Sequence, residues 1–292
     1  MLTVLTTTYN RAHCLSKLYR SLQEQDSKEF EWIVIDDGST DNTESLIKGW
    51  QEMENGFPIL YEKQKNGGKH RAVNAGIELA KGAFVFIVDS DDYLTKSAVS
   101  KAEKWIGEIE GNSGFAGISG TKGKSPEDML GEFPEKVPFV DATNLERMKK
   151  KLRGDKAEIY RTQLLKEYPF PEIEGEKFLP ENVVWDEIAH DGYKIRWYPD
   201  ILTVIEYRED GLTRNANQYI ADNFQGYTLA KQKIFRYYSF PYNWVGLVSY
   251  IKAARERSMT NQEIRKAMGL SHMENIIGNC FYIVWRLLKR AG

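Results

Sequence analysis

The stretch FVFIVDSDD, Phe84–Asp92, decides the fold prediction, because a buried strand ends there in a cluster of acids. Its first five residues are apolar and mostly β-branched or aromatic, which is typical of a strand buried on both faces. Asp89, Asp91 and Asp92 follow within four positions. In an extended chain Asp89 and Asp91 point to the same side, about 6–7 Å apart, with Ser90 between them. Two carboxylates that close repel each other unless a cation or hydrogen-bond donors neutralise them.

Two hypotheses account for this acidic cluster. Hard oxygen ligands at the end of a buried strand suit Mg²⁺ or Mn²⁺, most usefully an ion that bridges the phosphates of a nucleotide. Alternatively, Asp91 and Asp92 cap a helix that begins near Thr95, which is a common use of aspartate. The rest of the chain favours the metal hypothesis for Asp91, and the cap for Asp92.

The length and composition are those of a globular chain with a large core. The chain has 292 residues, of which 41% are hydrophobic, and its mean hydropathy is -0.52. No stretch reaches the roughly 18 apolar residues of a membrane span, and MLTVLTTTYN at the start indicates a strand rather than a signal peptide. Cys14 and Cys280 stand far apart, which favours free thiols in a reducing compartment. We therefore expect a cytoplasmic location.

The charge is distributed unevenly along the chain. The formal net charge is -2, yet residues 215–292 hold 11 Lys/Arg and 4 Asp/Glu, an excess of seven positive charges. The same stretch holds 13 of the 36 aromatic residues. An acidic body is thus followed by a basic and aromatic region, whose function needs a separate explanation.

Strand and helix patterns alternate over about the first 90 residues. Strands are predicted at residues 2–6, 30–35, 59–62 and 84–88, each of the first three followed by a helix with apolar residues at helical spacing. Asn10 is expected to cap the first helix, and Ser39 or Asp41 the second. This order predicts an α/β fold with a doubly wound, mainly parallel sheet flanked by helices.

Polar clusters follow three of the four predicted strands at their carboxyl ends. They are Thr7–Asn10, Asp36–Asp41 and Asp89–Asp92. Open parallel sheets bind ligands at this edge. The sequence therefore predicts a ligand site there.

The pattern is looser beyond the fourth strand. Further strands are predicted at residues 115–119, 139–140, 157–160, 194–198 and 202–207, and helices at 95–109, 161–168 and 181–190. From residue 215 onward the chain is expected to be helical, with helices at 218–238, 244–257, 262–268 and 273–288.

Four segments together, TTTYN, IDDGSTDNT, NGGKHRAVNAG and FVFIVDSDD, resemble in order and spacing the family 2 glycosyltransferases of the GT-A fold. The resemblance is close over roughly 110 residues and thinner to about Thr213. It implies a nucleotide-sugar-binding half at 1–110, an acceptor-binding half of the same domain at 111–214, and an added helical region at 215–292.

The resemblance assigns the donor site to the sheet edge. Thr7 and Tyr9 would line the pocket of the nucleotide base, with the Tyr9 ring stacked on it. Asp37 would accept a hydrogen bond from the base, because a carboxylate can accept from a ring N–H; its alternative role is to cap the next helix.

Gly67 and Gly68 would let the backbone approach the ligand closely. Lys69 would reach the base or the diphosphate, a role for which Arg71 also competes. The family often has an arginine directly before the asparagine matched by Asn74, and Val73 stands there in this chain.

The DXD motif of the family matches Asp89, Ser90 and Asp91. By this resemblance Asp89 and Ser90 belong to the donor site, and Asp91 coordinates Mn²⁺ or Mg²⁺ on the diphosphate, with Asp89 holding the ribose or sharing the ion. Many relatives add a histidine after the last strand. The matching stretch, residues 207–213, has none, so Asp210 or water would replace it.

A second requirement of sugar transfer is a base, because an acceptor hydroxyl is a poor nucleophile at neutral pH. The family places an acid near the start of a helix with an aromatic residue four positions later. Glu181 and Trp185 match this pattern, with Glu176 as a competing carboxylate. The alternative role of Glu181 is to stabilise the helix dipole from the first turn.

These inferences predict an inverting glycosyltransferase that moves a sugar from a nucleotide donor, expected to be a UDP-sugar, to a hydroxyl in bacterial polysaccharide or glycan assembly. The alternatives are a metal-dependent nucleotidyltransferase and a non-catalytic relative that binds nucleotide or membrane. The first is disfavoured because TTTYNRAH lacks the glycines of a nucleotidyltransferase loop. No nucleic acid is expected to bind.

The basic and aromatic region at 215–292 has two interpretations. Its composition, and the segment IIGNCFYIVWRLLKR near its end, suit an amphipathic surface for the inner face of a cell membrane and a lipid-linked glycan acceptor. The alternative is a helical subdomain that packs its aromatic residues on the core or on a second subunit.

Overall fold

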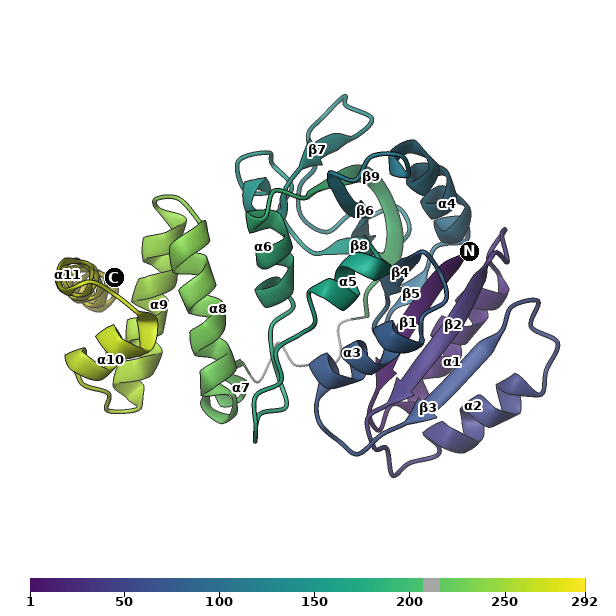
Figure 1. Ribbon diagram of the computed structural model, residues 1–292, viewed down its shortest axis with the longest axis horizontal. Coiled ribbons are helices and arrows are strands. Elements are labelled where there is room, and N and C mark those ends of the chain that lie inside the picture. The colour runs from purple at the N-terminus through teal and green to yellow at the C-terminus, as the bar shows by residue number, and fades with distance from the viewer. Residues whose placement is uncertain (207–215, 292) are drawn as a thin grey trace. The chain divides into compact units, whose positions relative to one another are not determined.

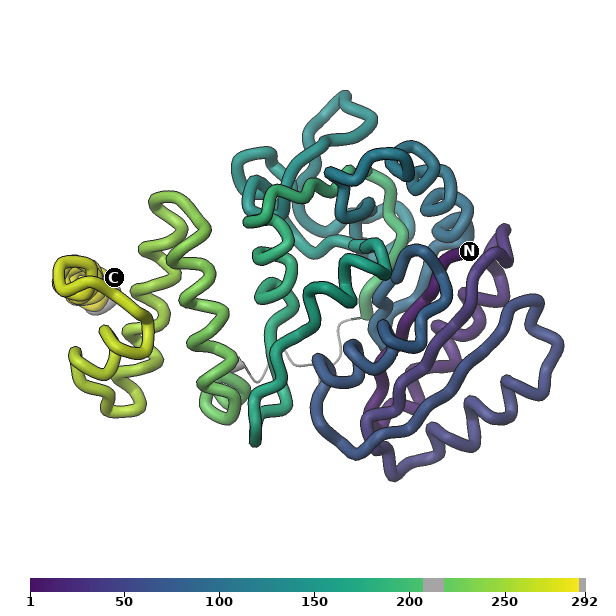
Figure 2. Tube along the Cα trace, viewed as in Figure 1, coloured from purple at the N-terminus to yellow at the C-terminus, as the bar shows by residue number. Residues whose placement is uncertain are grey.

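The computed structural model describes residues 1–206 and 216–291 and divides the chain into two compact units. The first unit comprises Met1–Glu172 and Ile188–Gly211, and the second comprises Ile173–Glu187 and Leu212–Gly292. Figure 1 shows a sheet with its helices in the first unit and helices in the second, and Figure 2 traces the chain through them. The structure thus groups 173–187 with the C-terminal helices, which the sequence did not indicate.

The first part of the sheet is parallel. Its strands are β1, β2, β3 and β4, at Leu2–Thr8, Phe30–Asp36, Ile59–Lys63 and Phe84–Ile87. They are joined by the helices α1, α2 and α3, at Ala12–Gln23, Thr43–Gln51 and Lys69–Leu79. Strand β1 pairs with β2 on one side and β4 on the other, and β2 pairs with β3, all in parallel register. The predicted doubly wound α/β arrangement is confirmed for this part.

Antiparallel pairings make the whole sheet mixed. The later strands are β5, β6, β7, β8 and β9, at Tyr93–Leu94, Phe115–Gly123, Val140–Ala142, Lys156–Arg161 and Lys194–Val204. Helices α4 at Ala98–Ile109 and α5 at Thr162–Glu167, and a short 3₁₀ turn at Asn144–Glu146, connect them. Among the described residues the strand order is β3-β2-β1-β4-β8-β6-β9-β5, with β7 on β9. Because β8 runs antiparallel to both β4 and β6, strands β4 and β6 point the same way.

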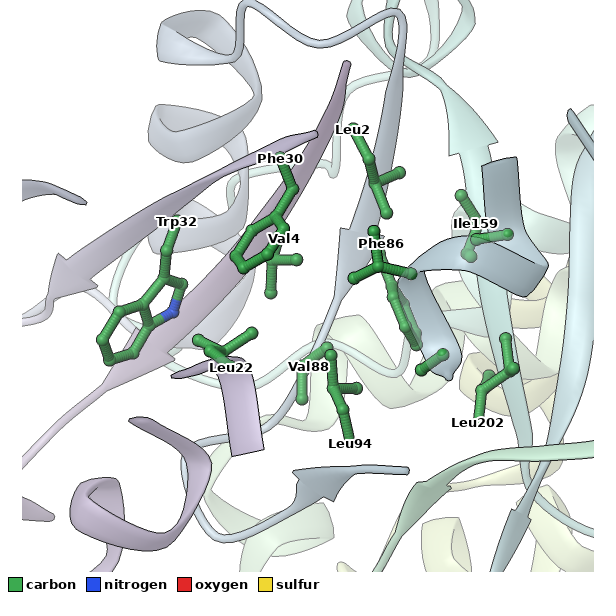
Figure 3. Packing of buried hydrophobic residues seen from close by; sticks show 14 of the residues in the cluster. Leu2, Val4, Leu22, Phe30, Trp32, Phe86, Val88, Leu94, Ile159 and Leu202 are labelled. Atoms are coloured by element: carbon green, nitrogen blue, oxygen red, sulfur yellow. The ribbon is translucent and has the colours of Figure 1, made fainter. Parts of the chain in front are cut away.

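Alternation along the strands builds the main core on one face of the sheet. Leu2 and Val4 of β1, Phe30 of β2 and Phe86 of β4 are almost fully buried on this face, together with Leu22 of α1. Figure 3 shows these side chains packed together. Residues of α1, α2 and α4 complete the cluster. The intervening strand positions face the other way.

Helix α3 covers that other face and contacts β1 and β2. Gly76 makes the close approach possible, because a Cβ at this position would lie 2.2 Å from a methyl carbon of Leu5. The tight packing fixes the start of α3, and with it the loop Asn66–Gly68, beside the carboxyl ends of the strands.

The second unit is helical. It contains most of α6 (Asn182–His190), inside which the two units meet along the chain, and the helices α7, α8, α9, α10 and α11, at Ala216–Asp222, Phe224–Tyr237, Tyr242–Glu256, Asn261–Met268 and His272–Ala291. Its small core includes Leu247, Tyr250, Ile251 and Met268. Within residues 1–206 and 216–291, no helix combines the length and apolarity that crossing a bilayer requires.

Several local predictions were wrong for identifiable reasons. Asn10 does not cap α1: it has a φ of 54°, its side-chain oxygen accepts from Thr40 N, and Asp41 accepts from Ala12 N instead. Asp92 does not cap α4, which begins at Ala98 after the short strand β5.

Two predicted element boundaries also differ from the structure. The helix predicted at 218–238 is two helices, because Asn223 lies at the break and accepts hydrogen bonds from Lys177 N and Phe178 N. The two strands predicted at 194–198 and 202–207 are one strand, β9, up to Val204, and residue 207 lies outside the described residues.

Candidate active site

The candidate site lies at the carboxyl ends of the parallel strands, where the strand order reverses. The chain builds β2 and β3 on one side of β1 and then returns to place β4 on the other side. Such a reversal leaves a crevice in which doubly wound folds bind ligands. The sequence-predicted clusters after β1, β2 and β4 all follow strands that end at this edge.

Asp89, directly after β4, is held between two lysines. Lys69 Nζ lies 2.6 Å from its Oδ1, and Lys122 Nζ lies 3.5 Å from its Oδ2. The Asp89 side chain is 36% exposed, so these ion pairs are accessible to solvent. Burial opposes ionisation, but the charges of Lys69 and Lys122 outweigh it and hold the pKa of Asp89 below its ordinary value. Asp89 is therefore an anion at neutral pH.

The other two acids of the cluster have different partners. Asp91 Oδ2 lies 3.7 Å from Nη1 of Arg11, which follows β1. Asp92 is nearly enclosed and accepts a 2.9 Å hydrogen bond from Lys122 Nζ. Burial, with a contribution from Asp89, raises the pKa of Asp92 to about 7, although Lys122 acts in the opposite direction. Asp92 is thus buried against Lys122, whereas the side chain of Asp91 is more exposed than that of Asp92.

Lys122 and Arg11 are the two cations of this cluster that the sequence analysis did not identify. Lys122 lies near the end of β6, about thirty positions from the acids in the chain, and reaches them because β6 runs parallel to β4. Burial lowers the pKa of Lys122, but Asp89 and Asp92 more than offset this and raise it above its ordinary value. No local motif marks this lysine, since its position depends on the pairing of β8 with β4 and β6.

Asp37, directly after β2, is surrounded by uncharged donors. Its Oδ1 accepts from Gln64 Nε2 at 2.7 Å and Gly67 N at 2.9 Å. Its Oδ2 accepts from Asn66 Nδ2 at 3.1 Å and Gly68 N at 2.7 Å. Four donors occupy the four lone-pair positions of a carboxylate, so a base N–H would have to displace one of them. In this structure Asp37 organises the loop that leads into α3.

Glycine is required at the end of this loop. Gly68 has a φ of 99°, a region in which side chains are strained, and its N–H points at Asp37. The turn delivers Lys69, the first residue of α3, to Asp89. The predicted loop and lysine thus meet the predicted acid. Arg71, the competing residue, pairs with Glu172.

The remaining predicted donor-site residues line the same edge. Thr7 is half-buried in β1, and Tyr9 just beyond the strand exposes 49% of its surface, as a ring available for stacking would. Ser90 is buried between Asp89 and Asp91. Their roles in nucleotide binding stay predictions.

A divalent cation is compatible with this donor set in a limited way. In the described part of the chain no three His, Cys, Asp or Glu side chains come together as an ion site. Asp89 and Asp91 offer hard carboxylate oxygens, and Mg²⁺ typically uses one or two carboxylates together with phosphate oxygens and water. Asp89 and Asp91 could therefore share an ion with a bound diphosphate. The proposed third ligand, Asp210, lies outside the described residues.

The two candidate bases belong to the second unit. Glu176 is buried, and its Oε1 and Oε2 accept from Gln225 N and Gly226 N, each at 2.7 Å, so this carboxylate caps the start of α8. Glu176 therefore contributes to the fold, and this engagement favours Glu181 as the base. Glu181 is half-buried directly before α6, and the aromatic residue four positions later, Trp185, is buried. Its role as a base stays a prediction.

Solved structures share this architecture. The crystal structure of Staphylococcus aureus TarS 1–349 in complex with UDP-GlcNAc aligns with a TM-score of 0.64, at 22% sequence identity, over 87% of this chain and 72% of that one. The mannosyltransferase PcManGT from Pyrobaculum calidifontis, solved with GDP-Man and Mn²⁺, aligns with a TM-score of 0.58 at 20% identity over 92% and 72%. The fold is therefore of the GT-A type.

Sequence comparison identifies the family. The model described as "Glycosyl transferase family 2" matches residues 3–168, and the chain belongs to this family. The poly(ribitol-phosphate) beta-N-acetylglucosaminyltransferase TarS of S. aureus is 34% identical over 174 residues, which are 58% of this chain but 29% of that protein. A GalNAc(5)-diNAcBac-PP-undecaprenol beta-1,3-glucosyltransferase of Campylobacter jejuni is 26% identical over 232 residues, 77% of this chain and 71% of that protein.

Proposed function

We propose that this chain transfers a sugar from a nucleotide-sugar donor, a UDP-sugar, to an acceptor hydroxyl with inversion at the anomeric carbon. The observation that carries the proposal is the ion-pair cluster at the sheet edge, in which Asp89 lies between Lys69 and Lys122, beside Asp91, which pairs with Arg11. Family membership supports the reaction class.

Charge balance explains how this cluster would receive a donor. Three carboxylates and the three cations Lys69, Lys122 and Arg11 neutralise one another at the edge. A donor diphosphate would give the three cations new anionic partners. A divalent cation would in turn give Asp89 and Asp91 a new cationic partner. When bound, such an ion stabilises the negative charge of the departing nucleoside diphosphate. The role of the chain itself is to hold the carboxylates and the cations of this cluster in position before the donor binds.

Glu181 is the proposed general base. It would accept the proton of the acceptor hydroxyl as that oxygen attacks the anomeric carbon, and a single displacement of this kind inverts the configuration. The assignment rests on the resemblance of Pro180–Trp185 to the family pattern, and it is supported by the engagement of the competing Glu176 carboxylate with two backbone N–H groups of α8.

The acceptor class is proposed from the relatives. TarS is named for poly(ribitol phosphate), and the C. jejuni protein for an undecaprenol-linked glycan. Both are bacterial glycans, so we propose a polysaccharide or lipid-linked glycan as the acceptor of this chain, at the cytoplasmic face of the membrane.

Release of UDP tests the proposal. The chain is incubated with a panel of UDP-sugars, Mn²⁺ and candidate glycan acceptors, and the nucleotide product is measured with and without EDTA. We expect UDP from at least one donor and loss of the signal in EDTA. Pyrophosphate as the product would establish a nucleotidyltransferase instead. UDP binding without turnover for any donor, unchanged in Glu181→Gln, would establish the non-catalytic alternative.

A further inference from the structure

The last helix of the second unit, α11, exposes several neighbouring aliphatic side chains. Ile283, Val284, Leu287 and Leu288 of α11 are each more than half exposed, up to 69% for Leu288. They form two pairs at i, i+4 spacing, so each pair lies one above the other on the helix surface. Single exposed aliphatic residues need no explanation, but a contiguous group of this kind marks an interaction site.

The opposite side of α11 is already used for packing on α9. A Cβ at Gly278 would lie 2.8 Å from Leu247, which is fully buried in the core of this unit. Asn275, three positions earlier, is buried as well. The exposed aliphatic side chains therefore do not lie on the side of α11 that packs against the core of this unit. They are additional apolar surface beyond what the unit needs to fold.

A groove between α9 and α11 extends this surface. It has a volume of about 520 Å³, and its lining includes Phe240, Trp244, Val245 and Trp285, together with Val284 and Leu288. Phe240 and Val245 are 70% and 64% exposed. We call the six exposed side chains Phe240, Val245, Ile283, Val284, Leu287 and Leu288 the apolar face.

Basic residues accompany the apolar face. Residues 242–291 contain eight Lys/Arg and three Asp/Glu. Lys252 lines the groove itself, Arg286 is exposed between Trp285 and Leu287, and Lys289 and Arg290 follow in the sequence. Apolar side chains with aromatic rings and flanking cations are the composition of a helix that lies in the interface of an anionic bilayer.

We propose that the apolar face is a docking surface for an anionic lipid bilayer. Charge complementarity selects this occupant over a second copy of the chain. Joining two copies through the face would bring two basic surfaces together, whereas acidic headgroups would attract them. The helix is too polar to span the bilayer, so α11 would lie along its surface with the aliphatic side chains inserted between headgroups. The inference does not use the transfer reaction, so its test is independent of the proposed function.

Vesicle sedimentation of the full chain tests the surface. The probes are vesicles of mixed phosphatidylglycerol and phosphatidylcholine, with pure phosphatidylcholine vesicles as the comparison. We expect the wild-type chain to sediment with the anionic vesicles, to bind the neutral vesicles more weakly, and to be released in part by added salt, because salt screens the headgroup charge.

The decisive variant is Ile283→Ser/Leu287→Ser. Burying one aliphatic side chain in an apolar environment is equivalent to at least about one factor of ten in affinity, so we expect a loss of at least about ten-fold. The matched control is Leu60→Ser/Leu79→Ser, which changes two exposed leucines of the first unit. Circular dichroism melting of both variants verifies that folding is intact.

Three results would overturn the proposal. One is a wild-type chain that does not sediment with the anionic vesicles. Another is equal binding of the α11 variant and its control. The third is a wild-type chain that forms dimers in sedimentation velocity, which Ile283→Ser/Leu287→Ser abolishes while vesicle binding stays unchanged. Retained affinity in Lys252→Gln/Arg286→Gln together with no salt dependence would also count against an anionic partner.

Discussion

Asp37 and Asp89 follow neighbouring parts of the same parallel sheet, yet their charges are balanced by different kinds of group. Asp37 is 4% exposed and accepts four hydrogen bonds from uncharged amides. Asp89 is 36% exposed and lies between two lysines. The donors around Asp37 belong to the loop before α3, two of them backbone N–H groups, so they are fixed by the fold. Lysine side chains are flexible and can change partners.

Two lysines on paired strands repeat the contrast. Lys156 of β8 lies beside Thr121 of β6, next to Lys122 in the chain. Lys156 Nζ donates to the carbonyl oxygens of Glu132 and Arg153, and burial lowers its pKa to about 8. Lys122 donates to carboxylates, and its pKa is raised. Uncharged groups thus partner Asp37 and Lys156, whereas charged groups partner Asp89 and Lys122.

The largest effect is expected from Asp91→Asn. The substitution keeps the side-chain size but removes the carboxylate proposed to coordinate the divalent ion on the diphosphate, so UDP release should fall by about 10³-fold. The matched control is Asp200→Asn, which breaks an ion pair with Lys101 on the surface of the same unit. Turnover in Asp91→Asn that equals the control would remove Asp91 from the mechanism.

Glu181→Gln and Glu176→Gln apply the same comparison to the second unit. Loss of a general base should lower turnover in Glu181→Gln by at least about 10²-fold while UDP binding is kept. Glu176→Gln should instead lower the melting temperature, because its carboxylate receives two backbone N–H groups of α8. Steady-state kinetics and melting curves of both variants separate the roles. Normal turnover with a lowered melting temperature in Glu181→Gln, or lost turnover with normal stability in Glu176→Gln, would contradict these roles.

Asp37→Asn should act mainly on stability. The wild-type carboxylate only accepts hydrogen bonds, whereas the NH₂ group of asparagine is itself a donor and would face some of the four surrounding donors. We expect this mismatch to lower the free energy of unfolding by about 1–3 kcal/mol. Urea unfolding measures this cost, with Asp128→Asn on an exposed loop as the control. A stability equal to wild type, with UDP binding abolished, would show that Asp37 acts on the nucleotide directly.

The smallest effect is a pH dependence that belongs to Lys156. Its folded-state pKa of about 8 lies below that of an unfolded lysine, about 10.4, so the unfolded chain binds more protons between these values. The contribution of Lys156 to stability should therefore rise across this window by on the order of 1 kcal/mol. Lys156→Met should be relatively most stable at neutral pH and lose that advantage as pH rises. An unchanged difference across the window would contradict the assignment, with the exposed Lys124→Met as control.

The parallel half of the fold could be predicted because its information is local. Each strand of β1–β4 is a short apolar run, and each polar cluster follows its own strand directly. Asp89, Asp91 and Lys69 could therefore be proposed from sequence, and the structure brings Lys69 and Asp89 together, while their roles stay predictions.

The missed features depend on contacts between distant segments. Lys122 reaches Asp92 through the order of β4, β8 and β6, which no motif encodes. The start of α1 is satisfied by Asp41 from the following loop rather than by the adjacent Asn10. The four donors around Asp37 could not be predicted either, because sequence shows its position after β2 but not the groups folded around it, and its role in base binding stays a prediction.

Calorimetric titration of UDP into the wild-type chain and Asp89→Asn, with and without Mn²⁺, tests most directly whether the ion-paired acids receive the donor. We expect Mn²⁺ to strengthen UDP binding to the wild-type chain, and Asp89→Asn to lose most of this gain while its melting temperature stays close to wild type. Equal strengthening by Mn²⁺ in both proteins would contradict this expectation.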